Sequence, residues 1–176
     1  MRQLKGITHR WPMHSFHDRK SFGEAHELRI CAELETRNWA VNPWGQSILR
    51  EEIRRAIART RWANFPDLVA VRDGDLVAID AKDRMSSADT GRYAVSQKCV
   101  SFGLQFIAAF GVPIFYVFGN LGVLTPQEVM AYGSRGPRGL GGSYYLINGR
   151  LAHQFDDVFG HPAVYGQKER NQDEVA

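Results

Sequence analysis

The sequence lacks any apolar run that approaches the roughly 18–20 residues of a membrane-spanning helix, so we expect no membrane partner. Cysteine is also scarce. Cys31 and Cys99 are the only two, and they follow no zinc-binding spacing, which predicts buried free thiols in a reducing compartment. Residues 1–20 contain no apolar segment of the kind that a secretory signal carries. We therefore expect a cytoplasmic protein of a bacterium or of a phage-infected host cell.

A large excess of one charge is absent too, because 22 Lys and Arg against 19 Asp and Glu give a net charge of only +3. The distribution is more informative than the total. Residues 1–20 are rich in basic side chains, which alternate with Trp11 and Phe16. This composition predicts a basic N-terminal arm that is either mobile or bound along a polyanion. Three His between positions 9 and 17 leave metal binding open. Their spacing matches no ligand motif, which favours a solvated arm.

The length of 176 residues and the hydrophobic content of 44% are sufficient for one domain with a core of its own. We expect this domain to span 21–165, and the polar segment 166–176 to be a disordered tail. Apolar periodicity, caps and turn residues predict its elements. The predicted helices are 21–37, 48–61, 92–110 and a short one between 125 and 133; the predicted strands are 39–43, 67–72, 75–82, 112–118, 144–147 and, after an Asn-Gly turn, 151–155.

The segment 66–82 is the centre of the chain. It consists of two apolar runs joined at Asp73-Gly74, a pair that favours a two-residue type I′ turn. Nearly continuous apolar runs are typical of strands covered on both faces. If Asp73 and Gly74 form the loop, the register of the hairpin places Asp67 opposite Asp80.

Two opposed carboxylates at the end of an apolar hairpin need a compensating charge. Like charges at a Cβ separation of roughly 4.5–5.5 Å destabilise a sheet. Lys82 follows Asp80 by two residues and therefore adds an amine to the same face. A divalent cation bound by Asp67 and Asp80 is the simplest way to stabilise the pair. A surface hairpin with solvated charges is the alternative, and a register shift of one residue would separate the acids.

The first predicted helix, 21–37, supplies a third candidate acid. Ser21 and Glu24 form a capping box at its start. Glu27 falls in the middle of the apolar side of the helix, where a carboxylate must be paired or bound to metal. The other interpretation is that Glu27 reaches solvent or caps a neighbouring group.

Two further segments are rich in arginine, a basic helical insert over 47–62 and a glycine-rich segment over 133–143. We expect the second to be a flexible loop, because Gly and Pro disfavour a regular element. Arginines clustered on a helix suit phosphate contacts, although a solvated helix face would have the same composition. With a lysine of the following helix, the predicted nucleic-acid contacts are Arg50, Arg54, Arg55, Arg59, Arg61, Lys98, Arg135 and Arg138.

Several of these residues together resemble the PD-(D/E)xK nuclease superfamily. They are Glu27 on a first helix, Pro66-Asp67 at a strand start, Asp80-Ala81-Lys82 on the next strand, and Gln97 on a following helix. Over 21–119 the pattern is similar to archaeal Holliday junction resolvases and to related phage or mobile-element endonucleases. Two features depart from it. The basic insert lengthens the gap before Asp67, and Asp80 stands where Glu is usual.

The resemblance implies an α/β fold with a restriction-endonuclease-like core, in which helices flank a mixed central β-sheet. It also implies hydrolysis of phosphodiester bonds with Mg²⁺ or Mn²⁺. In this family pattern, Asp67 and Asp80 would be metal ligands and Glu27 would complete or support the metal shell. Lys82 would orient or deprotonate the attacking water, and Gln97 would assist.

The sequence therefore predicts a metal-dependent DNA endonuclease that acts on branched or otherwise structured DNA, as in DNA recombination and repair. We expect a homodimer, because coordinated cutting of two strands needs two sites. Two alternatives stay open. A catalytically silent nucleic-acid-binding module would keep the basic segments and need no metal, and an endonuclease subunit of a restriction or transposition system would depend on a partner protein.

Overall fold

The computed structural model describes residues 25–44, 50–57, 65–83, 86–87, 90–139 and 142–163. Several predictions fall outside this part of the chain: the arm 1–20, the capping box at Ser21, the tail 166–176, and the predicted contacts Arg59 and Arg61. The side chains of Arg54 and Arg138 are not described either.

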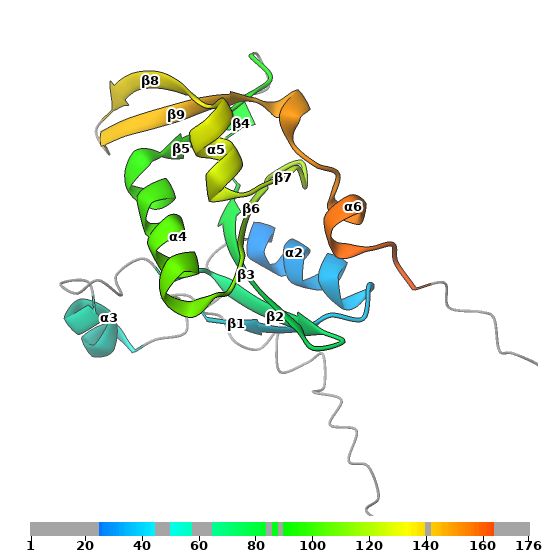
Figure 1. The fold of residues 1–176 in the computed structure, drawn as a ribbon. Helices are drawn as coiled ribbons and strands as arrows, with labels where there is room; N and C mark the ends of the chain where they lie inside the picture. The colour runs from blue at the N-terminus through cyan, green and yellow to red at the C-terminus, as the bar shows by residue number, and fades with distance from the viewer. Residues whose placement is uncertain are drawn as a thin grey trace, which may run out of the picture.

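A five-stranded sheet forms the centre of the molecule (Figure 1). In spatial order its strands are β1 (Ala40–Pro43), β2 (Leu68–Arg72), β3 (Asp75–Lys82), β6 (Ile114–Phe118) and β7 (Val123–Leu124). β3 and β6 are parallel, whereas the other neighbouring strands are antiparallel. This arrangement confirms the predicted α/β class with a mixed central sheet.

Helices cover both faces of the central sheet, as the apolar runs of β2 and β3 predict. α2 (Ala25–Glu35) and α6 (Phe155–Phe159) contribute to the core on one face, and α4 (Gln97–Phe110) and α5 (Pro126–Tyr132) to the core on the other. Figure 1 shows the two pairs on opposite sides of β3 and β6, with α3 (Glu51–Ile57) set apart from the sheet. None of the helices in the described part of the chain is long and apolar enough to cross a membrane.

A second sheet has four strands, in the order β4 (Ser86–Ser87), β5 (Arg92–Ser96), β9 (Gly142–Asn148) and β8 (Ser134–Gly139). The predicted strand 144–147 lies within β9. The predicted helix 92–110 is wrong over its first five residues, which form β5 and pair with β9. The helix starts at Gln97 because Ser96 takes the N-cap position, where its hydroxyl accepts a hydrogen bond from the Cys99 N–H.

The prediction of a flexible loop over 133–143 is wrong over 134–139, which form β8, and over 142–143, which begin β9, because the two strands pair antiparallel. The pairing shifts register between Arg135 and Arg138. This irregularity accommodates Pro137, which has no N–H to donate, on an edge strand. Pairing with β9 therefore overrides the low strand propensity of Gly and Pro.

The C-terminal segment packs against the turn that follows α2. In place of the predicted strand over 151–155, the chain forms a 3₁₀ turn, η2 (Gly149–Leu151), and then α6. Arg37 is only 6% exposed and holds α6 in place. Its guanidinium lies 2.5 Å from the Asp156 carboxylate and donates a hydrogen bond to the Gly160 carbonyl at 2.8 Å.

Candidate active site

The central hairpin has the predicted turn and register. Asp73 and Gly74 have φ angles of 52° and 93°, the positive values that a type I′ turn requires. Strand pairing runs outward from Arg72–Asp75 to Leu68–Ile79. Residues 67 and 80 are therefore the next two beyond the last pair, at the same end of the hairpin.

Asp67 is fixed at this end by backbone contacts on both sides. Its Oδ2 accepts a hydrogen bond from the Ala81 N–H at 2.8 Å, and its own carbonyl accepts one from the Trp44 N–H at 2.9 Å. Burial, and then the nearby charge of Asp80, raise the pKa of Asp67 from the usual 3.8 to about 8. Two adjacent charged carboxylates are therefore unfavourable here unless a positive charge offsets them.

The carboxylate of Asp80 is held on two sides. Its Oδ1 forms an ion pair with the Lys82 ammonium, and its Oδ2 accepts a hydrogen bond from the Cys99 Sγ at 3.1 Å. The side chains of Lys82 and Asp80 are only 15% and 19% exposed. Burial alone would lower the pKa of Lys82, but the charge of Asp80 raises it above its usual value. Lys82 is therefore a cation at neutral pH.

Tyr116 and Cys99 support this ion pair, and sequence reasoning missed both as members of the site. Tyr116 is fully buried and lies opposite Asp80 in the β3–β6 pairing. The Lys82 Nζ is 5.4 Å from the centre of its ring, and its hydroxyl donates to the Cys99 carbonyl at 3.1 Å. Burial, and then the charge of Asp80, raise the pKa of Cys99 to about 12, so its sulfur is a thiol at neutral pH. No spacing rule connects these positions, since only the packing of α4 on the sheet joins them.

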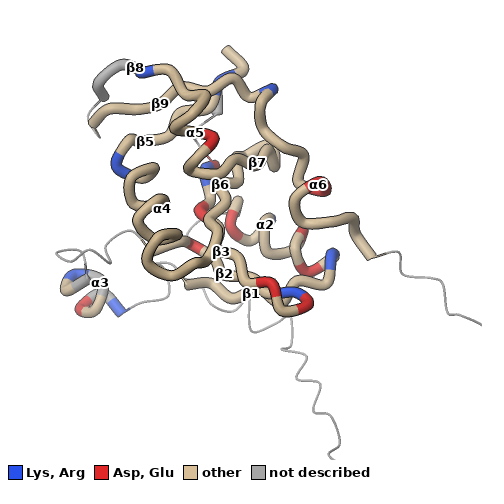
Figure 2. Tube along the Cα trace, viewed as in Figure 1, with Lys and Arg blue, Asp and Glu red and all other residues tan. Residues whose placement is uncertain are grey.

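Glu27 lies in the first turn of α2, the helix that packs on the face of the central sheet opposite α4. It is half-buried, and its charge is a smaller cause of the raised pKa of Asp67. Figure 2 shows an acidic segment of α2 beside acidic and basic segments of the central sheet. The neighbouring His26 is buried, and its Nε2 lies 3.0 Å from the Val117 carbonyl, which fixes this turn of α2 to β6.

The donor chemistry of the site fits a hard divalent cation. Carboxylate oxygens are the ligands that Mg²⁺ and Mn²⁺ prefer. A cation would offset both causes of the raised pKa of Asp67, the burial of its charge and the repulsion from Asp80. Within the described residues, no three His, Cys, Asp or Glu side chains are grouped closely enough to hold a metal ion. The relation of Glu27 to this site is the effect of its charge on Asp67.

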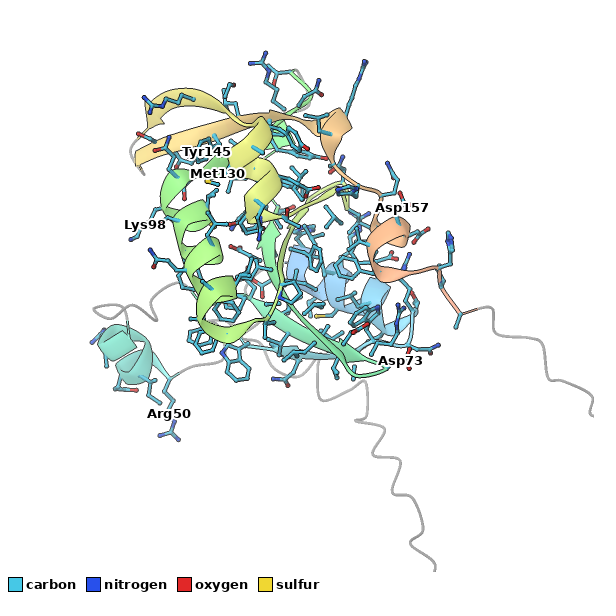
Figure 3. The ribbon with its side chains drawn as sticks, in the orientation of Figure 1. Arg50, Asp73, Lys98, Met130, Tyr145 and Asp157 are labelled. Atoms are coloured by element: carbon cyan, nitrogen blue, oxygen red, sulfur yellow. The ribbon has the colours of Figure 1, made fainter. Side chains whose placement is uncertain are left out.

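The remaining predicted site residues lie around this centre or on the surface. Gln97 is half-buried at the first position of α4, but the contact from this turn to Asp80 comes from Cys99. The described basic candidates are exposed: Arg50, Arg55, Lys98 and Arg135. Figure 3 shows Lys98 on the outer side of α4, and Arg50 beside α3 on the same side of the molecule. The structure thus brings together Asp67, Asp80 and Lys82 and leaves the basic residues distributed over the surface.

The mixed sheet, the helices on both of its faces and the acidic end of its central hairpin define a restriction-endonuclease-like α/β fold. Among solved structures, the chain is similar to Hjc of Archaeoglobus fulgidus, which is described as a Holliday junction resolvase from an archaeal hyperthermophile. The match covers 77% of this chain and 93% of that chain, with a TM-score of 0.51 and 16% sequence identity. At this identity the likeness shows the fold alone. No protein-family model matches the chain, and no curated protein matches it significantly.

Proposed function

We propose that this protein is a metal-dependent DNA endonuclease that hydrolyses phosphodiester bonds in branched or structured DNA. The observation that carries the proposal is the convergence of Asp67, Asp80 and Lys82 at one end of the central hairpin. The fold likeness to a Holliday junction resolvase supports a branched substrate.

Each residue of the proposed site has a separate role. Asp67 and Asp80 would hold Mg²⁺ or Mn²⁺, and Glu27 would support the metal shell from α2. When bound, the cation would polarise the phosphate and lower the pKa of a coordinated water. Because Lys82 is held as an ammonium by Asp80, its first role is to stabilise negative charge on the phosphate and to orient the attacking water. Gln97, at the start of α4, would assist at the rim of the site.

The partner of this site would be DNA, contacted by basic residues on three elements. These are Arg50 and Arg55 at α3, Lys98 on α4, and Arg135 on β8, with Arg54, Arg59, Arg61 and Arg138 as further candidates. Exposed arginine and lysine side chains bind phosphates without regard to base sequence. An endonuclease that recognises the structure of DNA and not its sequence needs contacts of this kind. A homodimer would supply the second active site for paired cuts.

The experiment is cleavage of labelled linear duplex, single strand, flap, fork and four-way junction, each with Mg²⁺, Mn²⁺ or EDTA. The wild type is compared with Asp80→Asn and with Asp157→Asn, a control that removes an exposed acid on α6. We expect metal-dependent cutting by the wild type and the control, strongest on a branched substrate, and none by Asp80→Asn. Absence of cutting with DNA binding intact would contradict the proposal. It would favour a silent binding module, unless a partner protein restores activity and thereby identifies a partner-dependent subunit.

A further inference from the structure

The first turn of α4 brings a sulfur atom against one of the proposed metal ligands. We infer that Cys99 is a positioning residue for Asp80, which holds one carboxylate oxygen so that the side chain is presented for metal binding in a single orientation. This inference rests on the proposed function, because it concerns how the same site holds its cation.

The two oxygens of Asp80 have different partners. The Cys99 Sγ lies 3.1 Å from Oδ2, whereas the Lys82 Nζ contacts Oδ1. A thiol is a weak hydrogen-bond donor, so Cys99 can orient Oδ2 without competing strongly for its charge. A side chain held on both sides loses less rotational freedom when it binds a ligand.

The backbone of Cys99 is itself anchored at two points. Its N–H donates to the hydroxyl of the N-cap residue Ser96 at 3.1 Å, and its carbonyl accepts from the hydroxyl of Tyr116 at 3.1 Å. Tyr116 is fully buried on β6, opposite Asp80 in the strand register. The position of the sulfur is thus set by both the helix cap and the central sheet.

Close packing of α4 keeps the tyrosine in this position. A Cβ atom placed on Gly103 would lie only 2.8 Å from the Tyr116 hydroxyl and 2.8 Å from the Cγ of Pro126. The absence of a side chain at Gly103 therefore allows Tyr116 to reach the Cys99 carbonyl. The contact to Asp80 is one end of a continuous chain of contacts, from Gly103 through Tyr116 and Cys99.

Outer-shell partners of metal ligands contribute to metal affinity, and their loss typically costs about 10–100-fold. Because a thiol is a weak donor, we expect Cys99→Ala to weaken Mn²⁺ binding by about tenfold, the low end of that range. Cys99→Ser replaces the thiol donor with a hydroxyl donor at the same position, and it should restore binding to within about twofold of the wild type.

The test is an electron paramagnetic resonance titration of free Mn²⁺ against the full chain without DNA, with the melting temperature measured on each sample. Cys31→Ala is the matched control, because Cys31 is the other cysteine and is a buried residue of α2 that packs in the core. We expect weaker Mn²⁺ binding in Cys99→Ala alone, with rescue by serine. Cleavage of a four-way junction should then need correspondingly more Mn²⁺ in Cys99→Ala, with similar rates at saturation.

Three outcomes would overturn the inference. If Cys99→Ala binds Mn²⁺ as tightly as the wild type, the thiol does not position Asp80, although the proposed function stands. If alanine and serine weaken binding equally, the effect of Cys99 is one of packing. If the wild type itself binds no Mn²⁺, the proposed metal site fails and the inference fails with it.

Discussion

The Oδ2 atom of Asp67 accepts a hydrogen bond from the backbone N–H of Ala81 at 2.8 Å, which joins the residue before β2 to the end of β3. The contact fixes a buried carboxylate beside Asp80, whose own partners are Lys82 and Cys99. The central hairpin thus brings together two acids, Asp67 and Asp80, and the amine of Lys82, all from one segment of sixteen residues.

Without metal, Asp67 should make the stability of the protein depend on pH. Its carboxyl binds a proton more tightly in the folded protein, where the pKa is about 8, than in the unfolded chain, where the usual value is 3.8. The folded state therefore binds more protons, and the free energy of unfolding should fall as the pH rises from about 4 to about 8. Asp67→Asn, which retains a carbonyl to accept from Ala81, should reduce this fall. Thermal melts in EDTA between about pH 5 and pH 8.5 would measure the pH dependence of stability in the wild type and in Asp67→Asn. Equal pH profiles for the two would contradict a raised pKa at Asp67.

The hairpin turn should depend on glycine at one position. Gly74 has a φ of 93°, and no atom lies within 4 Å of the place that a Cβ would take there. Gly74→Ala should therefore cost about 1–2 kcal/mol through backbone strain alone. Asp73→Asn is the control, since Asn tolerates positive φ, and it should change stability by less than about 0.5 kcal/mol. Urea unfolding would separate the two. If Gly74→Ala and Asp73→Asn were equally stable, the turn would not be type I′.

Arg37 should stabilise the C-terminal segment. Its side chain is 6% exposed, pairs with Asp156 and Glu33, and lies 5.0 Å from the centre of the Phe155 ring. Arg37→Met keeps much of the packing but removes these charged hydrogen bonds, and it should destabilise the fold by about 2 kcal/mol. Arg150→Met, at an exposed position of η2, should leave chemical denaturation unchanged. A stable Arg37→Met protein would show that α6 is held by its aromatic side chains instead.

The basic residues at α3 should affect DNA binding but not chemistry. Arg50 and Arg55 are both exposed, and each phosphate contact adds about one to the slope of affinity against salt concentration. The double substitution Arg50→Ala/Arg55→Ala should lower that slope by about two and leave the cleavage rate at saturating DNA unchanged. Binding isotherms at several salt concentrations would measure it, with Arg150→Ala on η2 as the control. An unchanged slope would mean that α3 lies away from the DNA.

Local patterns in the sequence predicted the hairpin and its register, because Asp73-Gly74 specifies both turn type and strand pairing. Tertiary pairing decided the cases where prediction failed. Residues 92–96 lead into the following helix without a Gly or Pro, and their pairing with β9 makes them a strand. β8 forms from a Gly- and Pro-rich segment for the same reason.

The sequence predicted those residues of the candidate active site that lie on the central hairpin. Asp67, Asp80 and Lys82 follow from strand alternation, which a sequence shows directly. Cys99 and Tyr116 could not be found this way, because their contacts depend on how α4 packs on β6. The family pattern points to Gln97, and the structure instead places Cys99, two residues later, against Asp80.

The proposed metal site can be located in a crystal structure of the full chain grown with Mn²⁺, with anomalous scattering measured at the manganese edge. We expect an anomalous peak within coordination distance of carboxylate oxygens of both Asp67 and Asp80, and its loss in crystals of Asp80→Asn. A peak elsewhere, or no peak at this end of the hairpin at saturating Mn²⁺, would contradict the proposed metal site.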